Sequence, residues 1–233
     1  KQNVESAYAE VALPVVTRPG FRARGLWMAA AVLLAVGSGF LAWRLKPAAD
    51  PAPLRKFEIA VVDPSLQVPP VISPNGRMLA YVSATQIWVR ELDKLEPRAL
   101  QGATGAVQLF WSPDSAFLGY LTNNKLWKVP VSGGEAVAIT VVGGNIFGGG
   151  GASWGEDGTI VYSRGDSGLF SVSERGGDPR VFLSLAENES DLHEPSWLPG
   201  GKGILVVIHP KNQPPNTLVV VSGGQRTVLL RLE

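Results

Sequence analysis

The stretch WSPDSAFLGYLTNNKLWKV, from Trp111 to Val129, contains a Trp, a Ser-Pro-Asp turn, an apolar strand, a polar turn and a second strand. The same order returns in WGEDGTIVYSRGDSGLFSV from Trp154 and in WLPGGKGILVV from Trp197, each 43 residues after the preceding Trp. ISPNGRMLAYVSATQIWV is the same unit with Ile72 in the Trp place, 39 residues before the first of these Trp residues. The chain therefore contains an internal repeat.

Each unit predicts several short strands separated by turn residues, and three units carry a Gly-Gly turn ahead of their final strand. Repeats of about 40–45 residues that each offer four strands are typical of β-propeller blades. A single four-stranded sheet cannot bury both faces, whereas stacked sheets cover one another. We therefore predict an all-β fold, a β-propeller with four visible blades over about residues 72–110, 111–153, 154–196 and 197–233.

The repeated positions predict structural roles. We expect the Trp or Ile that opens each unit to act as a wedge between neighbouring sheets, and the turn residues after it to reverse the chain. Carboxylate and amide side chains in these turns are also candidates for binding cations at the propeller mouth, but turn chemistry accounts for them without a ligand. The repeat residues are Ile72, Trp111, Trp154, Trp197, Pro74, Pro113, Asn75, Asp114, Asp157, Gly76, Gly158 and Gly201.

The predicted propeller region, residues 57–233, begins with FEIAVVD at Phe57–Asp63, an extra strand of the kind that closes a ring by completing its last blade. A ring of about six blades needs more residues than the repeats provide, so we expect an incomplete propeller with an open sheet edge. The chain begins with Lys, and we expect it to be part of a longer product.

An uncharged segment precedes the repeats. From Leu26 to Trp43 the sequence runs 18 residues without a charge, and a helix of that length spans about 27 Å, close to the thickness of a bilayer core. We predict a single transmembrane α-helix at 26–45, after a juxtamembrane tail at 1–25 and before a Pro/Ala-rich linker at 46–56. A buried core helix and a signal-peptide core are the alternatives.

The charges and the small residues of this segment bear on its membrane orientation and on helix pairing. Basic residues flank both of its ends, so the positive-inside rule does not decide the orientation. Ala31, Ala35 and Gly39 form a small-residue stripe through which two such helices can pack, which makes a homodimer a possible partner state. The rest of the chain, residues 51–233, holds 15 Lys or Arg against 17 Asp or Glu and offers no electrostatic footprint for nucleic acid.

Three motifs suggest chemistry, and each has a plainer explanation. GASWG around Ser153 matches a hydrolase nucleophile motif, but it leads into a turn and a strand instead of a helix. The Gly-rich stretch Gly143–Ala152 lacks the Lys-Ser/Thr of a phosphate-binding loop and is expected to be an inter-blade loop. His193, with Glu194 and Asp191 nearby, resembles part of a metal-ligand set, but we expect it to be solvated or packed in a blade.

Several stretches together resemble a known family. In order they are FEIAVVD, ISPNGRMLAYV, IWVRELDKLEPRALQGATGA, FWSPDSAFLGYLTNNKLWKVPVSGGEAVAIT, GASWGEDGTIVYS and HEPSWLPGGKGIL. Roughly residues 26–230 resemble the extracytoplasmic propeller, built of TolB-type blades, of bacterial transmembrane serine/threonine protein kinases. The chain departs from the family pattern at Ser115, in place of the usual turn Gly, and at Gly155-Glu156, in place of Ser-Pro or Gly-Pro.

The resemblance implies a function. It places a kinase domain, with its ATP and Mg²⁺, upstream of this chain, residues 1–25 in the cytoplasm, and the propeller outside the bacterial cytoplasmic (inner) membrane. The propeller is then a sensor or protein-interaction domain that binds a protein or envelope ligand. The chain itself shows no Gly-rich kinase loop, HRD or DFG, so we assign it no catalytic, cofactor or metal residue.

Three other interpretations stay open. A TolB-like anchored propeller can serve as an interaction scaffold without any kinase. A propeller can also gate a prolyl-oligopeptidase-type peptidase domain, which requires its own Ser, Asp and His downstream. Finally, an upstream winged-helix module would make the protein a membrane-bound transcription regulator.

Overall fold

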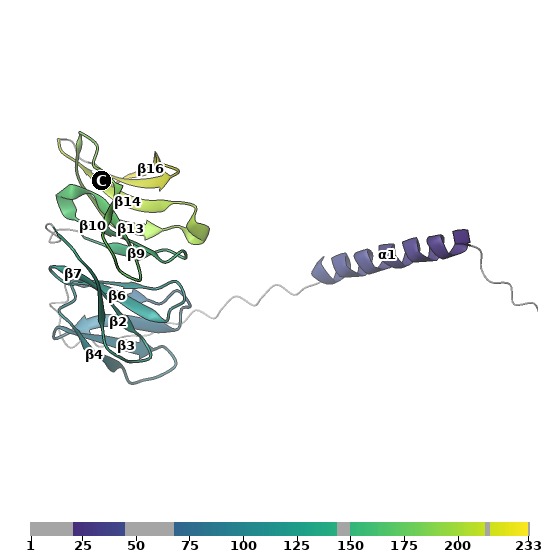
Figure 1. Ribbon diagram of the computed structural model, residues 1–233, viewed down its shortest axis with the longest axis horizontal. Coiled ribbons are helices and arrows are strands. Elements are labelled where there is room, and N and C mark those ends of the chain that lie inside the picture. Colours follow the sequence, from purple (N-terminus) through teal and green to yellow (C-terminus); the bar gives the residue numbers. More distant parts are fainter. Residues whose placement is uncertain (1–20, 45–67, 144–149, 213–214, 233) are drawn as a thin grey trace, which may run out of the picture. The chain divides into compact units, whose positions relative to one another are not determined.

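The computed structural model describes residues 21–44, 68–143, 150–212 and 215–232 (Figure 1). The chain divides into two compact units, Lys1–Glu58 and Ile59–Glu233. The predicted linker at 46–56, the predicted strand at 57–63 and residues 144–149 of the Gly-rich stretch lie outside the described residues.

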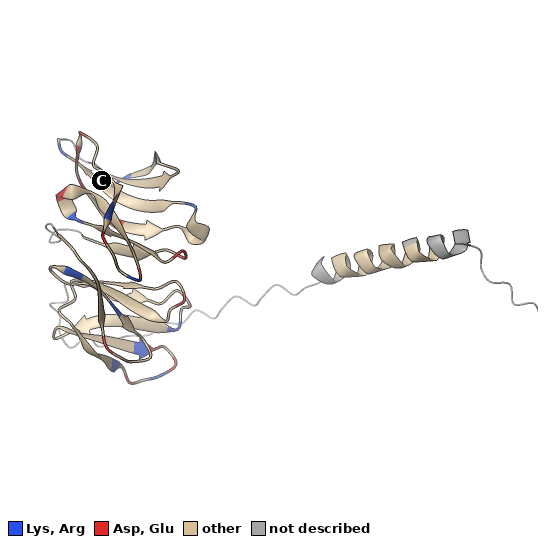
Figure 2. Cartoon of the chain, viewed as in Figure 1, with Lys and Arg blue, Asp and Glu red and all other residues tan. Residues whose placement is uncertain are grey.

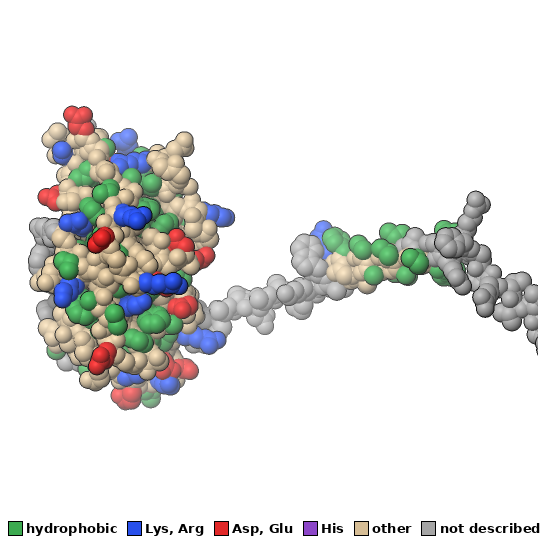
Figure 3. All heavy atoms as spheres, in the orientation of Figure 1, with side chains coloured by type: hydrophobic (Ala, Val, Ile, Leu, Met, Phe, Trp, Pro, Cys, Tyr) green, Lys and Arg blue, Asp and Glu red, His purple; other side chains and the backbone are tan. Residues whose placement is uncertain are grey.

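The described residues of the first unit form one helix, α1 (Phe21–Arg44), where the sequence predicted one at 26–45. Leu26, Trp27 and Leu34 are 73–76% exposed, and hydrophobic side chains cover most of the visible surface of the described helix (Figure 3). Among the described residues, however, no helix combines the length and the apolar character needed to cross a membrane. The helix is present at the predicted place, and its predicted membrane crossing is not supported.

The second unit consists of four antiparallel sheets, each of four strands, which lie one upon the next in Figure 1. Each sheet is a meander, so strands adjacent in sequence are hydrogen-bonded neighbours. The first two sheets comprise β1 (Val71–Ile72), β2 (Met78–Ser83), β3 (Gln86–Glu91) and β4 (Arg98–Thr104), then β5 (Gln108–Trp111), β6 (Phe117–Leu121), β7 (Lys125–Pro130) and β8 (Val137–Val141). The last two comprise β9 (Ala152–Trp154), β10 (Thr159–Ser163), β11 (Leu169–Ser173) and β12 (Arg180–Leu183), then β13 (Glu189–Trp197), β14 (Ile204–Pro210), β15 (Asn216–Ser222) and β16 (Gln225–Leu232).

The repeat residue of each unit occupies one equivalent position, the last residue of the first strand of its sheet. Ile72 ends β1, Trp111 ends β5, Trp154 ends β9 and Trp197 ends β13. The predicted repeat units therefore start at the end of the first strand, whereas each sheet starts a few residues earlier. Two short 3₁₀ turns, Gly165–Ser167 and Pro199–Gly201, lie between strands.

Three hydrophobic cores lie between consecutive sheets, and each core takes residues from two sheets only. Trp111 is buried against the first sheet, and Trp154 is buried with Phe110 of the second. Trp197 packs edge-on against Phe182 of the third sheet, with 5.7 Å between ring centroids. Each Trp thus lies against the preceding sheet, as expected for a wedge, whereas Ile72 opens the first described sheet and is 58% exposed.

A Gly in the second sheet leaves room for a neighbouring aromatic ring. Gly119 lies in the middle of β6 directly opposite Phe110 of β5. A Cβ atom built on Gly119 would lie 2.2 Å from Cε2 of Phe110. Phe110 is itself only 6% exposed, and its ring centroid lies 6.3 Å from that of Trp154 in the next sheet. The missing side chain therefore allows the second and third sheets to pack closely.

Charges of both signs are spread over the sheets, and Figure 2 shows Lys and Arg interspersed with Asp and Glu. Among the described residues, one ion pair has a buried carboxylate: a guanidinium nitrogen of Arg226 on β16, which is partly exposed, contacts Oε1 of Glu189, which is 7% exposed. Oε2 of Glu189 accepts a 2.7 Å hydrogen bond from the backbone N–H of Ala186. This pair ties the outer strand of the fourth sheet to the start of its first strand.

Candidate functional site

The first strands of the four sheets lie next to one another, and their ends surround a groove of about 760 Å³. Because each repeat residue ends a first strand, stacking the sheets brings the repeat positions and the turns after them to this one place. The repeat residues that line the groove are Ile72, Pro74, Trp111, Pro113, Trp154, Asp157, Trp197 and Gly201. Asp114 and Gly158 line a smaller hollow of about 290 Å³ beside it, and Asn75 and Gly76 line neither.

The groove has a mixed lining in which aromatic and Pro side chains are frequent. Its wall also includes Leu109, Leu198 and Pro195, and its only charged lining residues are Glu156 and Asp157, in the turn after β9. Cavities of 300–1,000 Å³ with a few fixed polar groups in an apolar wall are typical of binding sites. The two neighbouring carboxylates give one end of this wall a negative charge.

The turn carboxylates and amide are engaged in local hydrogen bonds. Oδ1 of Asn75 accepts from the hydroxyl of Ser73 at 2.7 Å and from the backbone N–H of Arg77 at 3.0 Å. Asp114 makes the same pair of contacts one sheet later, at 2.6 and 2.9 Å. The hydrogen bonds from the Ser112 hydroxyl and then the backbone lower the pKa of Asp114. These hydrogen bonds lie within the turns themselves.

Ser153 of the GASWG motif lies in the middle of β9. Its Oγ accepts a 3.0 Å hydrogen bond from the backbone N–H of Trp197, in the next sheet. A turn and β10 follow the motif, so the strand–turn–helix geometry of a nucleophile elbow is absent from this part of the described chain. The hydroxyl links two sheets.

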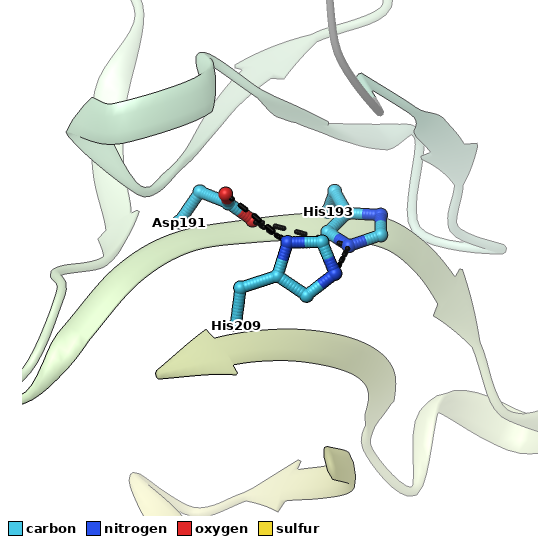
Figure 4. A group of neighbouring side chains, drawn as sticks. All are labelled: Asp191, His193 and His209. Carbon is cyan, nitrogen blue, oxygen red and sulfur yellow. Dashed lines mark hydrogen bonds and ion pairs between the residues drawn. The ribbon is translucent and has the colours of Figure 1, made fainter. Parts of the chain in front are cut away.

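A cluster of three titratable side chains lies on the fourth sheet. Asp191 and His193 lie two residues apart on β13, so they share a face, and His209 on β14 is paired directly with Asp191. Figure 4 shows the three side chains converging. The sequence drew attention to Asp191 and His193 but did not connect them with His209.

The distances within this cluster are short. Nε2 of His193 lies 2.9 Å from Nε2 of His209, and Nδ1 of His209 lies 3.1 and 3.2 Å from the two carboxylate oxygens of Asp191. Nε2 of His193 lies 3.9 Å from Oδ1 of Asp191. The side chain of His193 is 12% exposed, against 27% for Asp191 and 29% for His209.

The electrostatics of the cluster favour a neutral His193. Burial lowers the pKa of His193, the neighbouring imidazole of His209 lowers it further, and the carboxylates of Asp191 and Glu194 oppose this in part. A neutral imidazole keeps a free lone pair for a proton or a metal ion. The alternating residues Leu192 and Ile208 are buried with Val161 of the third sheet, so the cluster lies on the opposite face of the fourth sheet.

No family model matches the chain, and no curated protein sequence matches it significantly. Solved structures do resemble it. TolB from Acinetobacter baumannii is 18% identical, with a TM-score of 0.57 over 70% of this chain and 43% of that one. Oligogalacturonate lyase from Vibrio parahaemolyticus is also 18% identical, with a TM-score of 0.54 over 70% of this chain and 53% of that one.

The β-propeller domain of the Trilobed protease from Pyrococcus furiosus, which has an open velcro topology, is similar too. It is 18% identical, with a TM-score of 0.51 over 69% of this chain and 56% of that one. The chain thus spans about half the length of the structures it resembles. At these identities the likeness shows the fold alone: the four sheets are the blades of a TolB-like β-propeller.

Proposed function

We propose that the propeller is a protein-interaction domain and that the 760 Å³ groove binds a segment of its partner. The observation that supports this most directly is the convergence of all four blades on one groove, to which each blade contributes its repeat residue. Trp111 and Trp154 are largely buried in the cores beneath the groove, whereas Trp197 is partly exposed in it. A groove built from equivalent positions of several blades can hold an extended segment at several points at once.

The lining of the groove favours one class of partner. Trp, Leu and Pro side chains bind apolar and Pro-containing segments, which lose little conformational entropy when they are already extended. Glu156 and Asp157 are the charged groups of the wall, so a basic residue in the bound segment fits beside them. We therefore propose an extended peptide with apolar side chains and one Lys or Arg.

The test is a displayed library of random peptides selected on the full chain. We expect selected peptides to share an apolar, basic-containing sequence, and Ser196→Arg to reduce their binding at least 10-fold, because Ser196 is exposed in the groove. Ser132→Arg is the matched control, because Ser132 is exposed and does not line the groove. Equal binding by both variants would show that the groove is not the site.

We further propose that the segment around α1 anchors the propeller to the bacterial cytoplasmic membrane, with the propeller on the extracytoplasmic side. The support is the uncharged 18-residue sequence and the Trp residues at its ends. Expressed in a bacterium, the chain is then expected in the membrane fraction after alkaline extraction. Leu33→Arg with Leu34→Arg should release it, whereas Leu95→Arg, at an exposed propeller position, should not. Recovery of the unaltered chain in the soluble fraction would refute anchoring.

The finer proposal is that the parent protein is a receptor-like serine/threonine kinase, for which the support is the resemblance of the repeat sequences. A single helix transmits a signal most simply by changing how protomers associate, so a ligand on the propeller would alter kinase pairing. The decisive observation is the coding sequence upstream of this chain, where a kinase domain with its catalytic and metal-binding Asp residues is expected. Its absence would leave the anchored interaction scaffold.

A further inference from the structure

We propose that Asp191, His193 and His209 bind one divalent transition-metal ion, through two imidazole nitrogens and one carboxylate oxygen. Two imidazoles and one carboxylate form a ligand set for ions such as Zn²⁺, Fe²⁺ and Mn²⁺. The site is independent of the peptide groove, because none of its three residues lines that groove.

The possible donor atoms of the three side chains already lie close together. Two ligands about 2.1 Å from one ion lie about 3.0 Å apart at a right angle and about 4.2 Å apart when they are opposite. The measured separations are 2.9 Å between Nε2 of His193 and Nε2 of His209, 3.1 Å between Nδ1 of His209 and Oδ1 of Asp191, and 3.9 Å between Nε2 of His193 and Oδ1 of Asp191. The two nitrogens of His209 thus face different partners, and an ion would take one of them. One donor atom from each residue lies within 4.8 Å of the other two. Binding therefore requires side-chain rotations but no change of the sheet.

The hydrogen bonding within the cluster is incomplete without an ion. Oδ1 of Asp191 is buried and accepts no hydrogen bond, although it lies beside both imidazoles. Nδ1 of His193 is also buried and has no hydrogen-bond partner. Buried polar atoms are rarely left in this state, because each loses its hydrogen bonds to water without gaining a partner. A cation bound by one nitrogen of each ring would give the carboxylate oxygen a partner and would replace the 2.9 Å contact between the two Nε2 atoms, which are too close for an ion to lie between them.

The strands fix this arrangement. Asp191 and His209 are directly paired across β13 and β14, and irregularities in the register of β13 lie on either side of His193. The second irregularity includes Glu194, whose φ of 51° turns the chain. Ligands that start from paired strands keep their spacing, and three protein ligands leave at least one position of a tetrahedral ion open for water or for another donor.

The amino-acid composition of the chain allows a metal titration to report on this cluster. The sequence contains two His and no Cys, so every imidazole lies in this cluster and no thiolate can bind the metal. The full chain, purified with a tag that lacks His, is titrated with Zn²⁺ in a calorimeter and with Co²⁺ by visible absorption. We expect one ion per chain, and a Tm increase of about 5–10 °C when free Zn²⁺ is 100 times Kd.

Three variants and one control decide the assignment. His193→Ala and His209→Ala should each weaken Zn²⁺ binding by more than about 100-fold, and Asp191→Asn by at least about 10-fold. Asp178→Asn, the same change at an exposed position, should bind as the unaltered chain does. Millimolar Ca²⁺ should not compete, because Ca²⁺ prefers oxygen ligands.

Far-UV circular dichroism shows whether each variant keeps its sheets, and a comparison counts only between folded variants. Should His193→Ala or His209→Ala fail to fold, the Co²⁺ spectrum of the unaltered chain provides the second test, since nitrogen ligation shifts its bands from those of the aqueous ion. Absence of saturable Zn²⁺ binding, unchanged binding in the folded His variants, or displacement by Ca²⁺ would each overturn the proposal.

Discussion

Replacing Gly119 by Ala tests how closely the second and third sheets pack. An added Cβ would lie 2.2 Å from Cε2 of Phe110, and ordinary contact between these carbon atoms begins at 3.4 Å. The ring must therefore move by about 1.2 Å or leave its place. It has little room to do so, because Phe110 is 6% exposed and is buried in the core that contains Trp154.

The magnitude follows from two opposing effects. Overpacking of a buried site costs about 1–3 kcal/mol, and expulsion of the ring costs a similar amount in lost burial. Replacement of Gly by Ala also stabilises the folded state by about 0.4–1 kcal/mol, because it lowers the conformational entropy of the unfolded chain. We therefore expect Gly119→Ala to lower the free energy of unfolding by roughly 1–2 kcal/mol, and the Tm by about 2–8 °C.

Thermal unfolding of the full chain, followed by Trp fluorescence and circular dichroism, measures the effect. Phe110→Leu removes part of the ring, so the double variant should be more stable than the sum of the two single changes predicts. A Gly119→Ala chain as stable as the unaltered one, or strictly additive effects in the double variant, would refute the argument that the ring requires this Gly.

Three further predictions concern other contacts. The hydroxyl of Ser115 accepts a 3.2 Å hydrogen bond from the backbone N–H of Asn75 in the first sheet, and Ser115 has a φ of 62°. Ser115→Ala should cost about 1 kcal/mol in urea unfolding and Ser115→Gly less, since Gly adopts that φ freely; the reverse order would contradict this. Burial raises the pKa of Tyr120 to about 12, so its contribution to stability is complete below pH 10, the unfolded value, and is lost as the pH rises from 10 to 12. Relative to Tyr120→Phe, the chain should lose about 2–3 kcal/mol over that range, and parallel pH profiles would be the contrary result. Arg226→Ala leaves Glu189 buried without its cation and should cost about 3 kcal/mol, part of which Glu189→Gln in the same chain recovers; no recovery would show that the pair is not responsible.

The strands could be predicted well where a turn and an apolar alternation occur together. The apolar strand of each unit was expected after its turn, and the turns SPNG, SPDS and GEDG are indeed followed by strands that begin at Met78, Phe117 and Thr159. The first residue of the first strand in each sheet was harder to predict. These strands are short, and the Trp signal marks only the last residue, as Ala152–Trp154 shows.

The sites depended on information that the local sequence does not contain. His209 meets Asp191 only through the pairing of β13 with β14. The register irregularity between His193 and Ser196 moves this pairing by one residue from a simple count back from the turn. The groove requires the stacking of separate sheets, so its residues were predicted as turn and wedge residues before any cavity could be inferred. Asp114 and Asn75 could be explained from sequence, since their hydrogen bonds are made within a few residues.

The three separate cores have a consequence for communication through the propeller. Since each core joins two neighbouring sheets only, a disturbance of the first sheet reaches the fourth through two intermediate sheets and weakens at each step. The groove is different, because its wall takes residues from all four sheets. A molecule bound there contacts the first and the fourth sheet at once. It therefore couples the stability of sheets that otherwise contact only their neighbours.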